Sequence, residues 1–365
     1  MRNILFVLLL FVSICVFPWT AQGGNEVQVA LIPENPIVER ARHDQQINFD
    51  FLLTNSTNET LEIYSIEVSV LSPAKNLIAQ RRLDQNGDSI GTISTRTLKA
   101  GEKIVVFNPF YSFEAELKIH NLKFDFVFSS GDIAEKYKTT IFVHPREYTN
   151  KTKLQLPVGG TVFVHDGNDF YSHHRRLDIT GRMTTALGIK TNMTRYAYDF
   201  TVINDKGEMY KGAGELNEDW FGFGALVYAP GDGIILESEN SIPDNTKDHP
   251  VPMEREEIMK NVKRIFGNYV MIDHGNGEYS LLAHLKKGSL KVKTKDSVNA
   301  GQQLGGMGMS GDAFLVHLHY QLQSDKDFGE GLPSYFRNLK LQTGDRWIPV
   351  PSGHIDTGDI IRNAK

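Results

Sequence analysis

The chain has 365 residues, enough for two ordinary domains that each bury a core of their own. Its composition, 40% hydrophobic and 23% charged, is typical of a globular protein and excludes a disordered one. The formal net charge of -5 and the absence of a Lys/Arg stripe give no reason to expect nucleic acid as a partner.

The first residues predict export. Arg2 precedes an almost wholly apolar run from Ile4 to Val16, and small and polar residues follow from Pro18 to Gly24. This order is typical of a signal peptide, which we expect to span residues 1–23 and to be cleaved, so that the mature protein is periplasmic or extracellular. An uncleaved anchor is the alternative. The run is shorter than the roughly 20 residues of a transmembrane helix, however, so we expect no stable span in the mature chain.

The single cysteine, Cys15, lies inside this segment. Ile14 precedes it where a lipoprotein would carry a small residue, so we do not expect lipidation. The mature chain would therefore contain no cysteine, and any metal site in it must be built from His, Asp and Glu.

Residues 25–146 are predicted to form an immunoglobulin-like β-sandwich domain. Three segments alternate apolar and polar residues and then run into turn residues, which is the pattern of half-buried strands. The apolar positions are Ile47, Phe49 and Phe51, then Ile66, Val68 and Val70, and then Phe124, Phe126 and Phe128. Its histidines, His43, His120 and His144, are isolated in the sequence, so we expect a spacer or docking module without catalytic residues.

A polar linker is expected at Glu147–Lys153, followed by a second β-rich domain over residues 154–325. This second region is dense in glycine, which marks tight turns between many short strands. One helix is predicted over Glu254–Phe266, because apolar residues recur there at helical spacing and Gly267 follows as a stop. Residues 326–365 are predicted to be an extension packed on this domain.

The strongest chemical signal is His317-Leu318-His319, within an apolar run. Residues two apart in a strand point to the same face, so the two imidazoles can converge on one point. Such a pair also occurs as two ordinary surface histidines. The preceding motifs favour a metal site: Tyr279–Leu285 with its Ala-His-Leu end, the turn Val298–Gln302, and the glycine-rich turn Gly305–Gly311.

In this order the motifs resemble those of the lysostaphin-like zinc metallopeptidases, and the resemblance covers about Val158–Leu322. It implies a mostly β domain of duplicated β-hairpins, a barrel-sandwich hybrid. It also implies one Zn²⁺ ion and the hydrolysis of peptide bonds, most often in peptidoglycan stem peptides or cross-bridges. Peptidoglycan or another peptide is therefore the expected substrate.

The resemblance implies roles for single residues. Asp199 matches the family's carboxylate ligand and His319 its last histidine ligand. His284 and His317 match the two catalytic histidines that flank the zinc-bound water. Three protein ligands and one open position are what a hydrolytic zinc needs, because the ion lowers the pKa of its water and polarises the scissile carbonyl.

The sequence departs from the family at the first ligand. The position four residues before Asp199 is Arg195, and a guanidinium does not bind zinc. Either the site is degenerate or an upstream histidine, His173 or His174, completes it, and we favour His174. A second assignment pairs His174 with Asp178, because their spacing also fits a His-x-x-x-Asp pair.

Two functions are weighed at this point, and a general secreted protease that acts on protein substrates also stays open, because nothing in the sequence fixes which peptide enters the groove. The first is an exported zinc endopeptidase, which the four matching residues favour. The second is a degenerate module of the same fold that binds wall peptides or activates another hydrolase, which Arg195 favours. A lipoyl-type carrier shares the turn at Val298–Gln302, but the export signal argues against it.

The other histidines and two arginines are expected to be structural. His274 should organise a hairpin turn, and His165 and Asp166 should lie in a loop. For His249 and His354 we expect loops without partners, and for Arg175 and Arg176 a solvated strand end.

Overall fold

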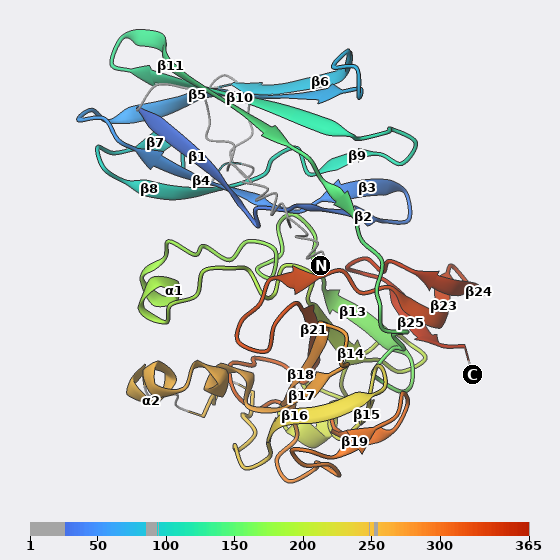
Figure 1. Ribbon diagram of the computed structural model, residues 1–365. Coiled ribbons are helices and arrows are strands. Elements are labelled where there is room, and N and C mark those ends of the chain that lie inside the picture. Colours follow the sequence, from blue (N-terminus) through green and yellow to red (C-terminus); the bar gives the residue numbers. More distant parts are fainter. Residues whose placement is uncertain (1–25, 85–92, 94, 248, 252–254, 365) are drawn as a thin grey trace, which may run out of the picture.

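The computed structural model describes residues 26–84, 93, 95–247, 249–251 and 255–364 (Figure 1). The predicted signal segment with Cys15 lies outside these residues. The described chain is mostly β, as predicted. None of its described helices has the length and apolar character needed to cross a membrane.

The described residues of the N-terminal part form three sheets. The first has the order β1 (Val27–Ile32), β4 (Asp50–Asn55), β8 (Lys103–Phe107). The second has the order β11 (Ile133–Val143), β10 (Asn121–Ser130), β5 (Leu61–Leu71), β6 (Leu77–Asp84), and β7 (Thr97–Leu98) pairs with β5. A small third sheet has the order β12 (Arg146–Glu147), β2 (Ile37–Arg40), β3 (Asp44–Ile47), β9 (Ser112–Glu114). We call strands β1 to β12 the N-terminal sandwich.

The apolar side chains of the predicted alternating segments pack between the first two sheets and join them. The ring of Phe51 on β4 lies 4.9 Å from the rings of Phe124 and Phe126 on β10, and all three side chains are fully buried. Ile66 and Val68 on β5 belong to the same core. Each side chain of this size contributes about 2 kcal/mol when fully buried, so the alternating residues hold the sandwich closed.

The C-terminal part is one large sheet of antiparallel strand pairs. Its order is β19 (Ser297–Val298), β16 (Gly233–Glu239), β17 (Asn268–Asp273), β18 (Tyr279–Leu285), β21 (Leu318–Gln323), β14 (Tyr198–Val202), β13 (Val162–Asp166), β25 (Ile360–Asn363), β23 (Phe336–Thr343), β24 (Arg346–Gly353). The short β22 (Gly331–Leu332) pairs with β21. A separate pair consists of β15 (Leu226–Tyr228) and β20 (Gln303–Gly306). We call the large sheet the C-terminal sheet.

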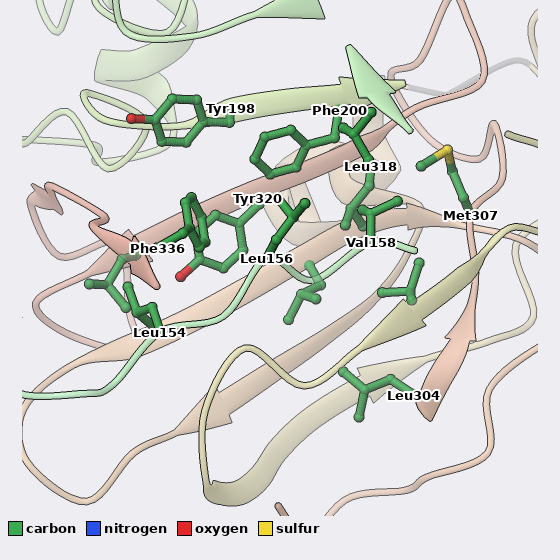
Figure 2. Close-up of a cluster of buried hydrophobic side chains, with 14 of the residues drawn as sticks. Leu154, Leu156, Val158, Tyr198, Phe200, Leu304, Met307, Leu318, Tyr320 and Phe336 are labelled. Atoms are coloured by element: carbon green, nitrogen blue, oxygen red, sulfur yellow. The ribbon is translucent and has the colours of Figure 1, made fainter. Parts of the chain in front are cut away.

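The core of this part lies beside β14 and β21. Figure 2 shows Phe200, Leu318, Tyr320 and Phe336 with Val158 in one cluster, and all five are fully buried. Because side chains alternate along a strand, the residues between these core positions point to the other face of β14 and β21. Two site residues, Asp199 and His319, occupy such positions.

The helical prediction was partly wrong. Two pieces occupy the segment, α2 (Arg255–Lys260) and the 3₁₀ helix η2 (Val262–Phe266), which ends at Gly267 as expected. Asn261 interrupts them, because its backbone is extended and its side chain accepts a hydrogen bond from the Lys263 amide at 3.1 Å. The other helices within the described ranges are short: α1 (Arg182–Ala186) and the 3₁₀ helix η1 (Asn217–Asp219).

The segment expected as a polar linker is anchored. The buried carboxylate of Glu278 accepts hydrogen bonds from the amides of Lys151 and Thr152, at 2.8 and 2.7 Å, and from the Tyr148 hydroxyl at 2.6 Å. After the site strands, β23 to β25 extend the large sheet, and β25 pairs with β13. The strands that follow residue 326 are therefore part of the C-terminal sheet.

Candidate metal centre

Strand register brings the first site residues together. Asp199 on β14 lies directly opposite His319 on β21, which in turn lies opposite Ala283 on β18. Residues paired across antiparallel strands point to the same face. His284 would point to the opposite face in a regular strand, but its φ of 60° is left-handed and breaks the alternation. Its ring lies 4.7 Å from that of His317.

Three imidazoles surround one oxygen of Asp199. His319 Nδ1 lies 3.0 Å from Oδ1, and the Nε2 atoms of His174 and His317 each lie 3.5 Å from it. The His-x-His pair therefore converges as its spacing predicts, although β21 begins only at Leu318. All four side chains are at least nine-tenths buried.

The second nitrogen of each imidazole fixes which tautomer faces the centre. Nδ1 of His174 lies 3.1 Å from the Gly167 carbonyl, Nδ1 of His317 2.9 Å from that of Leu315, and Nδ1 of His284 2.8 Å from that of Ser310. A carbonyl oxygen can only accept, so each Nδ1 carries the hydrogen. In the neutral form, each Nε2 then keeps a lone pair.

His319 has the opposite tautomer, set by a chain of glutamine side chains. Its Nε2 donates to Gln321 Oε1 at 2.9 Å, and Gln321 Nε2 donates to Gln323 Oε1. Gln323 Nε2 donates to the Asp325 carbonyl at 2.5 Å. Because this carbonyl only accepts, it orients both amides and leaves the lone pair of His319 on Nδ1, which faces Asp199.

The chemistry of this donor set fits zinc. Imidazole lone pairs and a carboxylate converge on one place, and all of them are acceptors, which repel each other unless a cation lies among them. Neutral imidazole nitrogen and carboxylate oxygen are the ligands that Zn²⁺ takes in proteins without cysteine. Each of these histidines also has the outer hydrogen bond that orients a metal ligand.

The pKa shifts of Asp199, His317 and His284 also suit zinc binding. Burial raises the pKa of Asp199, but the positive charges that His317 and His174 carry when protonated, and the hydrogen bonds that protonated His174 and His319 donate, outweigh it and hold that pKa well below its usual range. Burial lowers the pKa of His317. Burial also lowers the pKa of His284, and the nearby imidazoles of His317 and His319 add to this, so that it lies well below its usual range. At neutral pH the centre therefore has a carboxylate and at least two neutral imidazoles.

Of the two upstream histidines, His174 is the one that faces Asp199. His173 has its side chain 70% exposed, and its Nδ1 pairs with Asp166 Oδ2 at 2.7 Å. The hydrogen bond to Asp166 raises the pKa of His173. Ligand atoms of Asp166, His173, His174 and Asp199 all lie within 4.8 Å of one another, so this pair borders the centre.

Arg195 lies outside the centre. Its fully buried guanidinium donates from Nη1 to Asp50 Oδ2 at 2.6 Å, from Nη2 to the Ile32 carbonyl at 3.2 Å, and from Nε to Glu330. Two of these partners belong to the N-terminal sandwich. The position at which the family has its first ligand is thus used for contact between the two parts of the chain.

The second assignment of the carboxylate is not supported. Asp178 is exposed and accepts hydrogen bonds from the amide and hydroxyl of Thr180, at 2.8 and 2.7 Å. His274 does organise a turn, because Nδ1 donates to the Asp232 carbonyl at 2.7 Å and Nε2 lies 2.8 Å from Ser280 Oγ.

Three structural expectations were wrong. His165 and Asp166 lie at the end of strand β13, whereas a loop was expected. His354 is buried, with its two nitrogens 2.9 Å from Glu39 and 2.9 Å from Asp356. Arg175 is also buried and bonded to Asp50, whereas a solvated strand end was expected. Sequence reasoning also missed Gln321 and Gln323, although their spacing of two and four from His319 along one strand was a usable signal.

Comparison with known proteins gives a family match over residues 219–329, to the model described as peptidase family M23. These residues include His284, His317 and His319 but neither Asp199 nor His174. Over 99 residues the chain is 33% identical to the peptidoglycan DD-endopeptidase ShyA of Vibrio cholerae. That match covers 27% of this chain and 17% of the length of ShyA.

Two solved structures are similar to the chain at low identity. The catalytic domain of lysostaphin from Staphylococcus simulans has 18% identity and a TM-score of 0.25, with 50% of this chain and 90% of that chain covered. A zinc-containing peptidase from Vibrio cholerae has 14% identity and a TM-score of 0.30, with 78% and 84% covered.

Proposed function

We propose that this chain, which carries a peptidase M23 domain, is an exported zinc metalloendopeptidase that hydrolyses peptide bonds of peptidoglycan. Asp199, His174 and His319 would hold the ion, and His284 and His317 would act in catalysis. The observation that carries the proposal is the convergence of three imidazole lone pairs on Asp199 Oδ1. The proposed domains are residues 25–146, 154–325 and 326–365, after a signal peptide at 1–23.

The residues of the centre suit hydrolysis of a peptide bond. When bound, Zn²⁺ would lower the pKa of a water molecule and polarise the scissile carbonyl. His317 and His284 have free Nε2 lone pairs and depressed pKa values, so either can take the proton of the attacking water. The imidazolium formed can then donate to the leaving amine or stabilise the oxyanion.

The name of ShyA supports peptidoglycan as the substrate class, and the predicted signal peptide supports a place outside the cytoplasm. The alternative, a degenerate module that binds wall peptides or activates another hydrolase, depended on Arg195. Ion pairs with Asp50 and Glu330 give this arginine another role, and His174 supplies a nitrogen in its place.

Zinc content and wall digestion test the proposal together. We expect one zinc per chain in the protein from Gly24 onward, and release of new amino groups from purified peptidoglycan. His174→Ala and His319→Ala should lose both, whereas His249→Ala, at an exposed position, should keep both. A zinc-free unmutated protein, or undiminished digestion by His319→Ala, would contradict the assignment.

A further inference from the structure

The loop that carries His174 is bonded to the N-terminal sandwich through the next residue. Arg175 is fully buried and uses its guanidinium on one short segment before and at the start of β4. Nη1 donates to Asp50 Oδ1 at 2.7 Å, Nη2 to the Phe49 carbonyl at 2.9 Å, and Nε to Asn48 Oδ1 at 3.2 Å. These bonds fix the position of the backbone immediately after His174.

The other oxygen of Asp50 reaches the segment that precedes Asp199. Oδ2 accepts from Arg195 Nη1 at 2.6 Å, and Arg195 lies four residues before Asp199. The Asp50 side chain is 2% exposed, so its charge is shared almost entirely between Arg175 and Arg195. One carboxylate of the N-terminal sandwich therefore links the neighbourhoods of two proposed zinc ligands.

Further contacts hold the same loop against the sandwich. Phe170 stacks on Tyr111 with ring centroids 4.7 Å apart and packs with Val105 and Phe107 of β8. Asn168 Nδ2 donates to Glu39 at 3.2 Å. The Gly167 carbonyl, which fixes the tautomer of His174, begins this stretch.

Residues of the segment between β13 and β14 also hold the loop in place. Asn192 Nδ2 and Thr194 Oγ1 each donate to the carbonyl of His174 at 3.0 Å. Residues 167–181 form no helix or strand of their own. A loop without regular structure has many conformations to lose, so the position of its side chains depends on such outside contacts.

We propose that the N-terminal sandwich is a structural part of the metal centre, with Asp50 as a positioning residue that acts through Arg175 and Arg195 on His174 and Asp199. The consequence for zinc binding rests on the proposed function. The positioning itself does not, because it concerns the metal-free protein. It assigns the sandwich a role beyond that of a spacer.

The test compares the full protein with Asp50→Asn, with Arg175→Met and with a control. Arg175→Met removes the hydrogen bonds that this residue of the His174 loop makes to the N-terminal sandwich. It leaves the ion pair between Asp50 and Arg195 in place. Arg42→Gln is the matched control, because Arg42 also joins the two parts through Asp356 and Asp359 but has no bond to the loop. Hydrogen exchange is followed in chelator-treated protein, and zinc affinity is measured by competition with a chelating dye.

We expect amides of residues 167–181 to exchange about tenfold faster or more in Asp50→Asn and Arg175→Met, with β17 and β18 still protected. Zinc affinity should fall about 10- to 100-fold in both variants, the range for partners that orient a metal ligand. Arg42→Gln should match the unmutated protein in both measurements.

Unchanged exchange of the loop in Arg175→Met overturns the proposal, whatever Asp50→Asn does. If Asp50→Asn loses protection throughout the molecule, Arg175→Met decides alone, because it keeps the buried pair with Arg195. If the unmutated protein binds no zinc while the loop exchanges faster in Arg175→Met, the proposed function fails and the positioning role stands.

Discussion

At the scale of single residues, Gln321 sets the tautomer of His319 through a hydrogen bond on the side of the ring away from Asp199. Its Oε1 accepts the Nε2 hydrogen of His319, and Gln323 and the Asp325 carbonyl hold it in that orientation. An outer partner of this kind raises the basicity of a ligand and fixes its ring. The His-x-His motif predicts the ligand, but only the structure shows which partner sets its tautomer.

Gln321→Met should therefore weaken zinc binding about 10- to 100-fold, because it removes the acceptor without touching the centre. Gln321→Glu should keep affinity closer to that of the unmutated protein, since a carboxylate also accepts from Nε2. Competition with a chelating dye measures both. Gln342→Met, on an exposed part of β23, is the control, and equal affinity for all three variants would remove this role from Gln321.

The residues of the centre differ in how far the sequence predicts them. His317 and His319 follow from strand periodicity, because two residues on one face need no long-range information. His174 was favoured only through the family resemblance. The bonds that Arg175 and Arg195 make beside the centre were not predicted, because their partners lie far away in the chain. Asp50 is 125 positions from Arg175 and 145 from Arg195, and no local pattern indicates such a pairing.

At the scale of elements, β18 contains a local conflict. His284 has φ of 60°, a left-handed conformation that costs a residue with a Cβ about 1–2 kcal/mol. The strand as a whole is well paired with β17 and β21. The conflict turns the imidazole toward His317, so the strain serves the geometry of the centre.

Replacing His284 should separate activity from stability. His284→Ala and His284→Gly should both keep zinc while hydrolysis falls about 100-fold or more, because a general acid–base group is lost. His284→Gly should be about 1 kcal/mol more stable than His284→Ala, because glycine accepts this backbone conformation. Urea unfolding measures the difference, and equal stabilities would argue against strain at this position.

Secondary structure was predictable where one face of an element is buried. The strands β5 and β10 follow from alternation, because slipping by one residue would expose every apolar side chain. The break at Asn261 was not predictable from apolar spacing, because a side-chain cap leaves that spacing unchanged.

At the scale of the whole molecule, His354 is an ionisable contact between the two parts. Burial lowers its pKa, but Glu39 on β2 and Asp356, itself paired with Arg42, outweigh this and raise the pKa to about 10. The imidazolium is thus bonded to one carboxylate from each part of the chain.

This contact predicts a pH dependence of stability. A folded-state pKa above the unfolded value means that the stabilisation is complete below about pH 6.5 and is lost as pH rises toward 10. We expect His354→Gln to lower the free energy of unfolding by on the order of 3 kcal/mol at pH 6, and by much less at pH 10. Urea unfolding at both pH values tests this, and a pH-independent difference would contradict it.

The anchoring of Tyr148–Thr152 by Glu278 bears on how the molecule behaves in solution. A free connection would let the two parts reorient separately, and each would then show its own rotational correlation time. With the connection bonded to a buried carboxylate, and Asp50 and His354 joining the parts elsewhere, they tumble as a single particle. The proposed peptide substrate would therefore meet a preassembled surface, and diffusion of one half relative to the other would not limit how often the centre is complete.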